Sequence, residues 1–200
     1  MRLSMLQLLQ RAAVGAALFY AQALAWAQLP PQAQAGDLIF RQGTEAVSHM
    51  VRTVDQGLYS HVGLLVAPAQ PDEAWQVLHA TPSEHPGQPD AVVLDSLDFF
   101  LDVRRAHAYR LYQVTADPGA RERAVAWAMA QQGQPFQLLG SGQGIYCTTL
   151  VWRAWLQSGA DLEVVFTEVE LPMLGGRYLL PSSLLRSSRL RALTPLLPTR

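Results

Sequence analysis

The stretch GQGIYCTTLVWRAWL, residues 142–156, predicts a helix whose first turn holds a cysteine. Glycines punctuate the approach to this helix, and four apolar residues between positions 150 and 155 then repeat with helical spacing. Gly159 supplies a stop after the apolar run. We therefore expect a helix that has Cys147 in its first turn and packs deep in the core.

Cys147 is the only cysteine, so the chain cannot form an internal disulfide. At the start of a helix, unpaired backbone N–H groups and the positive end of the helix dipole stabilise a thiolate, which lowers the pKa of the thiol. The same N–H groups can hold the oxyanion of an acyl-transfer reaction. The position favours a nucleophile, and the alternative is a buried, inert thiol.

Two predicted strands place two histidines side by side. Tyr59–Val66 has the β-branched and aromatic content of a strand, and Trp75–Ala80 follows it after a turn-rich loop. An antiparallel hairpin centred near Gln70 would set His61 opposite His79 on one face, so that one ring can hydrogen-bond the other and fix its tautomer. A slip of one residue in either strand would move its side chains to the other face.

Five short motifs follow one another in an order that resembles a known family. They are Gly36-Asp37-Leu38-Ile39-Phe40, Tyr59-Ser60-His61-Val62-Gly63, Val77-Leu78-His79-Ala80, Gly133-Gln134-Pro135-Phe136 and Tyr146-Cys147-Thr148-Thr149-Leu150-Val151-Trp152. Their order is similar to that of the permuted papain-fold cysteine amidases, the YiiX/YaeF-like branch of the NlpC-type cell-wall hydrolase superfamily. The resemblance implies an α+β chain with a circularly permuted papain-like fold, in which an antiparallel sheet packs against helices.

The resemblance also implies roles for individual residues. Cys147 is similar to the family's nucleophile, His61 to its general base and acid, and His79 to the polar residue that orients the base. Three further residues are expected to border the site and bind substrate, although either tyrosine can equally be core packing: Tyr59, Ser60 and Tyr146.

The chain departs from the family pattern at three places. Many permuted members have Glu where this chain has His79, and a carboxylate would stabilise an imidazolium more strongly than a neutral ring does. Thr148-Thr149 stand where family members often have Ser-Glu, and Phe136-Gln137 stand where they often have Tyr-Asp. These departures leave open a different polarity of the substrate-facing surface.

The composition excludes several classes of function. The chain has 200 residues, of which 50% are hydrophobic, so it can build one ordinary globular domain and is not intrinsically disordered. Its formal charge of −1 gives no electrostatic footprint for nucleic acid. All 15 basic residues are arginine, which excludes Schiff-base and P-loop mechanisms because both need a lysine.

The amino terminus is predicted to be a secretory signal peptide, residues 1–27. Two arginines precede an uncharged apolar stretch, and Ala25-Trp26-Ala27 has the small-x-small form of a cleavage site. We expect a periplasmic or secreted protein, with residues 28–200 as a single domain and no stable membrane insertion after cleavage. A retained anchor helix is the alternative.

The rest of the chain completes an α+β pattern. Helices are predicted over 44–54 and 117–132, strands over 92–94 and 108–114, and a short helical turn over 97–101, whereas 184–193 fits a helix or a strand. The spacing of His49, His61, His79 and His85 fits no metal motif, so neither a metal nor a cofactor is predicted. Asp37 is expected to be a hydrogen-bonding group at a turn or sheet edge.

The residues together predict acyl transfer to water through a thioester on Cys147, with His61 as base and His79 aiming it. The expected substrate is an amide of a cell-wall peptide. An acyl-lipid or N-acyl amide substrate, in a hydrolase or acyltransferase, is the first alternative, and a catalytically silent module that binds peptide or lipid is the second. The sequence leaves the scissile bond and the oligomeric state open.

Overall fold

The computed structural model describes residues 29–70, 73–84, 86–138, 140, 143–170 and 175–199. The predicted signal peptide and His85 therefore lie outside the described residues. Among those that are described, no helix is long and apolar enough to span a bilayer.

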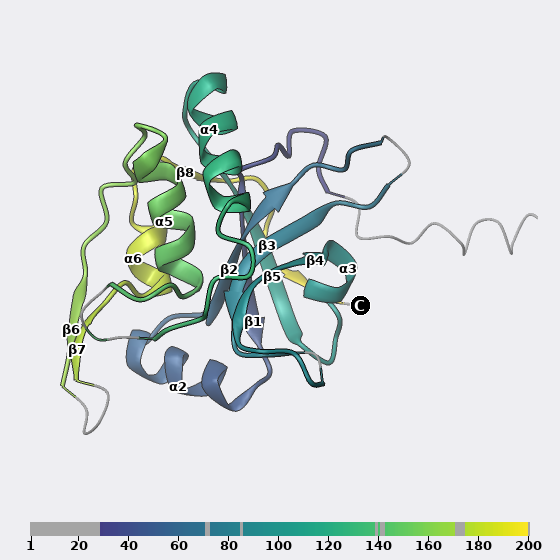
Figure 1. Ribbon diagram of the computed structural model, residues 1–200. Helices are drawn as coiled ribbons and strands as arrows, with labels where there is room; N and C mark the ends of the chain where they lie inside the picture. The colour runs from purple at the N-terminus through teal and green to yellow at the C-terminus, as the bar shows by residue number, and fades with distance from the viewer. Residues whose placement is uncertain are drawn as a thin grey trace, which may run out of the picture.

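One antiparallel sheet organises the molecule (Figure 1). Its strands are β1 (Leu38–Gly43), β2 (His61–Val66), β3 (Gln76–Thr81), β4 (Ala91–Ser96), β5 (Ala106–Val114), β8 (Leu190–Ala192) and β9 (Leu197–Pro198). They lie in the order β4-β3-β2-β1-β5-β8, and β9 also pairs with β5. A separate two-stranded ribbon is formed by β6 (Thr167–Val169) and β7 (Gly176–Tyr178). The strand content and the antiparallel pairing confirm the expected α+β class.

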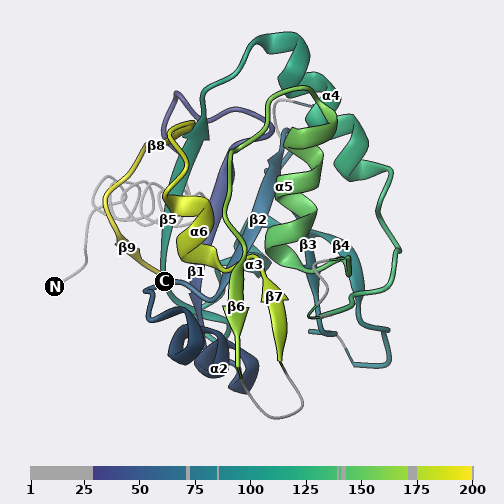
Figure 2. The same ribbon diagram turned by 90° about the vertical axis from the view of Figure 1, so that its left-hand side faces the viewer.

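Helices cover the sheet on both sides (Figures 1 and 2). The helices are α2 (Ala46–Asp55), α3 (Leu97–Phe100), α4 (Pro118–Met129), α5 (Cys147–Gln157) and α6 (Pro181–Leu185). Helices α4 and α5 pack against each other, and α5 also packs on β2 and β3. The short helix α3 lies on the opposite side of the sheet (Figure 1).

The alternation of side chains along β1 produces two hydrophobic cores. Leu38 and Phe40 join the core beneath α5, which includes Leu150 and Trp155. Ile39, between them, joins the second core, beside Phe100 of α3. Both faces of the strand are covered here, which explains why residues 38–40 are all apolar and do not alternate with polar ones.

The helix that the sequence predicts at Cys147 is confirmed. Tyr146 stands at its N-cap, and the Tyr146 backbone N–H donates to the Thr149 side-chain oxygen at 2.9 Å. This bond satisfies a donor before the first turn, so the chain enters the helix at a fixed point. Helix α4 is capped in the opposite sense, since the carboxylate of its N-cap residue Asp117 accepts from the Ala120 N–H at 2.7 Å.

The predicted register of the hairpin is wrong by two residues. Leu65 pairs with Val77 and not with Trp75, so the paired residues are symmetric about position 71 and not about Gln70. A shift of two preserves the face of every side chain, whereas a shift of one reverses it. His61 and His79 therefore still share a face, but lie diagonally across the two strands.

The ambiguous segment 184–193 contains a helix end and a strand. Helix α6 ends at Leu185, and β8 begins at Leu190 and pairs with β5. The predicted helix over 117–132 ends at Met129, three residues early, and the remaining predicted elements are present with small differences in their bounds.

Candidate active site

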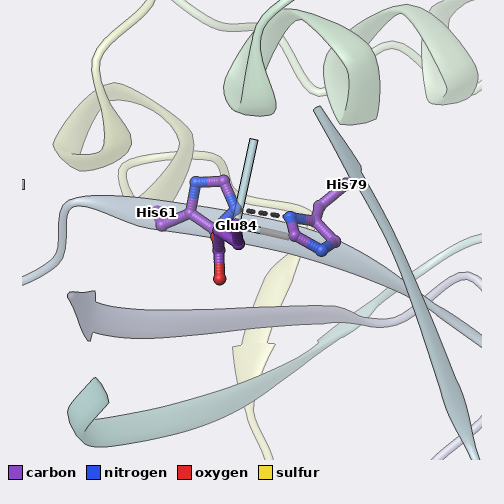
Figure 3. A group of neighbouring side chains, drawn as sticks. All are labelled: His61, His79 and Glu84. Atoms are coloured by element: carbon purple, nitrogen blue, oxygen red, sulfur yellow. Dashed lines mark hydrogen bonds between the residues drawn. The ribbon is translucent and has the colours of Figure 1, made fainter. Parts of the chain in front are cut away.

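The two imidazoles predicted to be neighbours form a hydrogen bond. His61 Nε2 lies 2.8 Å from His79 Nδ1, and both side chains are buried. Figure 3 shows the two rings joined by this bond. Gly63 makes room for the arrangement, because a Cβ at that position would clash with a methyl group of Val77 on the neighbouring strand.

A third group continues the contact on the next strand. Asp95 Oδ2 of β4 lies 3.1 Å from His79 Nε2. Asp95 is not among the site residues predicted from the sequence, because the strand is predicted there only as far as residue 94. A period of two continued from Val93 would have placed Asp95 on the same face, and a carboxylate inside an apolar strand is itself an unusual feature.

The order of these contacts fixes which nitrogen carries each proton. Since an ionised carboxylate only accepts, His79 donates its Nε2–H to Asp95, and His79 Nδ1 is then an acceptor. His61 consequently donates its Nε2–H to His79, which leaves His61 Nδ1 as the basic nitrogen. The His61 ring is thereby prepared to receive a proton on the side away from His79.

Aromatic and cationic groups support the pair of rings. The Phe100 ring packs against both imidazoles, with centroids 5.7 Å from His61 and 5.0 Å from His79. The Arg41 guanidinium lies 4.5 Å from the Phe100 centroid, and Arg41 Nη1 donates to the Phe100 carbonyl oxygen at 2.9 Å. Burial, the positive charge of Arg41 and the neighbouring His79 hold the pKa of His61 well below its usual value, so the His61 ring is neutral at neutral pH.

Cys147 approaches the same place from the helix. The pairing of β2 with β3 runs from Val66 to Leu64 and does not continue to His61, so the two strands diverge where the histidines stand. At this opening the Val62 N–H interacts with the Cys147 sulfur. Cys147 and His61 line one cavity of about 210 Å³, so a substrate carbonyl placed there can meet both groups.

The electrostatics of Cys147 differ from the expectation. Burial raises the pKa of the Cys147 thiol to about 11, although the backbone N–H groups of Val62, Thr148 and Cys147 act in the opposite direction. The predicted lowering of this pKa is therefore wrong, because desolvation outweighs the helix terminus. At neutral pH the resting site holds a protonated thiol and a neutral imidazole, and His61 must take the proton as the sulfur attacks.

The three predicted substrate-binding residues occupy different surroundings. Tyr146 lines the cavity, and its hydroxyl oxygen accepts from the Leu179 N–H at 2.9 Å. Ser60 also lines it, and its hydroxyl oxygen accepts from the Gly43 N–H at 2.9 Å. Tyr59 packs against Phe40 in the core and does not form part of the cavity wall.

Thr148 and Thr149, one of the departures noted in the sequence, hold the helix start in place. The Thr148 hydroxyl donates to the Leu179 carbonyl oxygen at 2.6 Å, and the Thr149 hydroxyl donates to the Gly144 carbonyl oxygen at 2.9 Å. Both side chains are buried. These threonines thus attach the start of α5 to the loop before it and to the segment before α6. Phe136, at the other departure, lines the cavity.

One group of side chains in the described part of the chain has donor atoms close enough to hold a metal ion. One nitrogen each of His61 and His79 and a carboxylate oxygen of Glu84 lie within 4.8 Å of one another (Figure 3). Glu84 is already paired with Arg41 and Arg105, however, and each ring is hydrogen-bonded to the other. Two adjacent guanidinium groups oppose the binding of a cation, so these residues fit an ion-pair network better than a metal site. His49, one of the four histidines whose spacing was tested against metal motifs, is exposed on α2.

The sheet, the helix that carries the cysteine and the histidines on strands that precede it define a permuted papain-like cysteine hydrolase. A family model described as "Permuted papain-like amidase enzyme, YaeF/YiiX, C92 family" matches residues 32–194. The chain therefore belongs to the YaeF/YiiX family of permuted papain-like amidases and is a hydrolase.

A solved structure agrees with this assignment at the level of the fold. It is the metalloprotein YiiX from Escherichia coli O157:H7, with a TM-score of 0.66 at 16% sequence identity. The similarity covers 84% of this chain and 99% of that one. A comparison with curated proteins gave no match.

Proposed function

We propose that this amidase acts through Cys147 and His61 on an amide whose acyl group is apolar, and that it does so after export. The observation that carries the proposal is the cavity that holds Cys147 and His61, since apolar side chains make up most of its wall. They include Val47, Val51, Phe136, Leu138 and Leu180.

A smaller apolar cavity of about 50 Å³ adjoins the first, and Cys147 is not part of its wall. The two share Val51, Leu138, Tyr178 and Leu180, and the smaller one adds Met50, Val54 and Val169. The shared residues make the two cavities neighbours beside α2, and their apolar walls suit an aliphatic chain. Burying each methylene of such a chain contributes about 0.8 kcal/mol.

The charged groups of the cavity wall already have partners. Arg41 is paired with Glu45 and Glu84, and Glu84 is also paired with Arg105. A charged peptide would have to compete with these pairs, whereas an apolar chain does not disturb them. This favours the N-acyl amide over the cell-wall peptide, which remains the prediction made from the resemblance.

The proposed reaction has two halves. As the Cys147 sulfur attacks the carbonyl carbon, His61 Nδ1 takes the thiol proton, and backbone N–H groups at the start of α5 stabilise the oxyanion. His61 then gives that proton to the leaving amine, which departs and leaves a thioester. Water attacks the thioester with His61 as base, and the carboxylic acid and the free thiol are released.

Hydrolysis of p-nitroanilides with acyl groups of two, four, eight and twelve carbons tests the proposal. We expect kcat/KM of residues 28–200 to rise with chain length by at most about fourfold per methylene, in line with 0.8 kcal/mol. Disaccharide-peptide fragments, analysed by mass spectrometry, are expected to remain uncleaved. If those fragments were cleaved and long acyl groups were not preferred, the proposal of an apolar acyl group would be refuted.

Matched variants distinguish the residues that carry out the reaction from the cavity walls that bind the acyl chain. Cys147→Ala and His61→Ala are expected to lose activity by about 10⁴-fold or more. Val51→Trp fills the space where the two cavities meet, so it should remove the preference for long chains and retain acetyl hydrolysis. Thr53→Trp, at an exposed position on the same helix, serves as the control and should leave the preference intact.

A further inference from the structure

We propose that Asp95 is a positioning residue of this site: through His79, its carboxylate sets the tautomer in which His61 presents Nδ1 to the sulfur. The inference rests on the proposed roles of Cys147 and His61. With Asp95, the two histidines become part of a chain of three hydrogen-bonded groups. Many members of the resembling family are expected to have a carboxylate at position 79, and here Asp95 provides one on the next strand.

The strand registers explain how three groups on three strands come into line. His79 pairs with Val93, and Asp95 stands two residues further along β4, opposite Val77. Asp95 therefore lies diagonal to His79 on the same face of the sheet. His61, on β2 at the other side of β3, lies diagonal to His79 in the same way. The repeated diagonal produces the contacts of 2.8 Å and 3.1 Å.

Burial makes the direction of each hydrogen bond matter. The His79 side chain is 0% exposed and that of Asp95 is 12% exposed, so solvent does not readily compensate for a wrongly placed proton. If His79 carried its proton on Nδ1, that N–H would point at His61 Nε2, and His61 would have to hold its own proton on Nδ1. A ring in that form cannot accept the thiol proton there.

The other charged groups around His79 do not replace this function. Arg41 opposes protonation of the ring, while Glu84 and Asp95 favour it. Glu84 is paired with two arginines, whereas Asp95 is the carboxylate hydrogen-bonded to the ring itself. Asp95 is therefore the group that selects between the two neutral forms of His79.

Asp95→Asn provides a close test because an amide keeps the shape but can turn its NH₂ toward His79. Assayed with octanoyl p-nitroanilide, the variant should lose about 10- to 100-fold in kcat with little change in KM, as orienting groups commonly do. In a His79→Ala background the same substitution should cause no further loss, because its route to His61 is gone. Asp98→Asn, an exposed carboxylate of the adjacent helix α3, is the matched control and should retain full activity.

Nitrogen-15 NMR of the imidazoles gives a readout that does not depend on turnover. In the wild-type protein we expect His61 and His79 both in the Nε2–H form, and in Asp95→Asn a change toward Nδ1–H. An Nδ1–H form of His79 in the wild type, an unchanged kcat in a folded Asp95→Asn, or losses that multiply in the double variant would overturn the inference. Retained activity in Cys147→Ala or His61→Ala would instead contradict the proposed function, while the NMR result would still judge Asp95.

Discussion

Strand β1 has a buried arginine–carboxylate pair near each of its ends, and the two pairs have different surroundings. Asp37, immediately before the strand, accepts from Arg121 at 2.8 Å, and its two oxygens also accept from the Gln34 and Val114 N–H groups. Arg121 donates further to the Ala35 and Val114 carbonyl oxygens. Asp37 and Arg121 are thus hydrogen-bonded to each other and to the backbone, and we call them the closed pair.

At the other end, Arg41 and Glu84 form part of the cavity wall beside His61, and we call them the open pair. Among the described contacts, the buried Nε atom of Arg41 has no hydrogen-bond partner. The comparison shows that a buried ion pair has no fixed role. Where every oxygen is satisfied by the backbone it serves the fold, and where it borders a cavity its charge acts on the chemistry inside.

The largest effect is expected from breaking the closed pair. Asp37→Ala leaves the Arg121 guanidinium without its carboxylate, and the loss of one partner of a buried pair costs about 3–5 kcal/mol in the free energy of unfolding. Urea denaturation measures this loss. The kcat per folded molecule should stay unchanged, and a fall in kcat would remove the distinction between the two ends of β1.

Breaking the open pair should change catalysis more than folding. Glu84→Gln leaves Glu45 as the remaining carboxylate paired with Arg41, so more of the positive charge of Arg41 acts on His61, and that charge already contributes to the lowered pKa of the His61 ring. A weaker base takes the thiol proton less readily, so we expect kcat to fall by about tenfold. Kinetics across a pH series measures the change.

Asp102→Asn, which removes a carboxylate from a surface pair with Arg104, is the control for this substitution. It should leave kcat unaltered. If Glu84→Gln lowered stability as much as Asp37→Ala and kcat not at all, both ion pairs would have to be considered structural.

A third expected effect is a pH dependence of stability that originates at the end of β1 beside His61. The pKa values of both His61 and His79 are lowered, mainly by burial, so below about pH 6.5 the unfolded chain binds protons that the folded chain does not. The free energy of unfolding should therefore fall as the pH drops through 6.5, by up to about 1.4 kcal/mol per pH unit for each ring.

Thermal denaturation at pH 7.5 and pH 5.5 measures this slope. His79→Asn should reduce it, because one of the two buried rings is gone. An equally steep slope in the variant would mean that other groups cause the loss of stability.

The sequence predicts the elements of the site better than their energetics. The period of α5 and the two histidine strands are evident in residues 59–80 and 147–156, and the error of two in the register changed no face. The length of the connecting loop, which sets that register, leaves no periodic signal. The helix start at Cys147 is visible in the sequence, but the burial that raises the thiol pKa depends on segments distant along the chain.

Asp95 shows a second limit of sequence patterns. The contact with His79 joins two strands whose pairing has to be known before their side chains can be matched. The cavity is also hidden from the sequence, since its apolar wall combines α2, the loop before α5 and the segment before α6. Such surfaces arise from packing, and local spacing carries little of that information.

The protonated resting state of Cys147 has a consequence for the lifetime of the molecule. Peroxides oxidise cysteine through the thiolate, so a sulfur that keeps its proton until a carbonyl arrives is chemically quiet between turnovers. With a single cysteine in the chain, a sulfenic acid formed there would have no internal thiol to reduce it. Desolvation at the head of α5 therefore slows attack on the substrate but shields the nucleophile from irreversible damage.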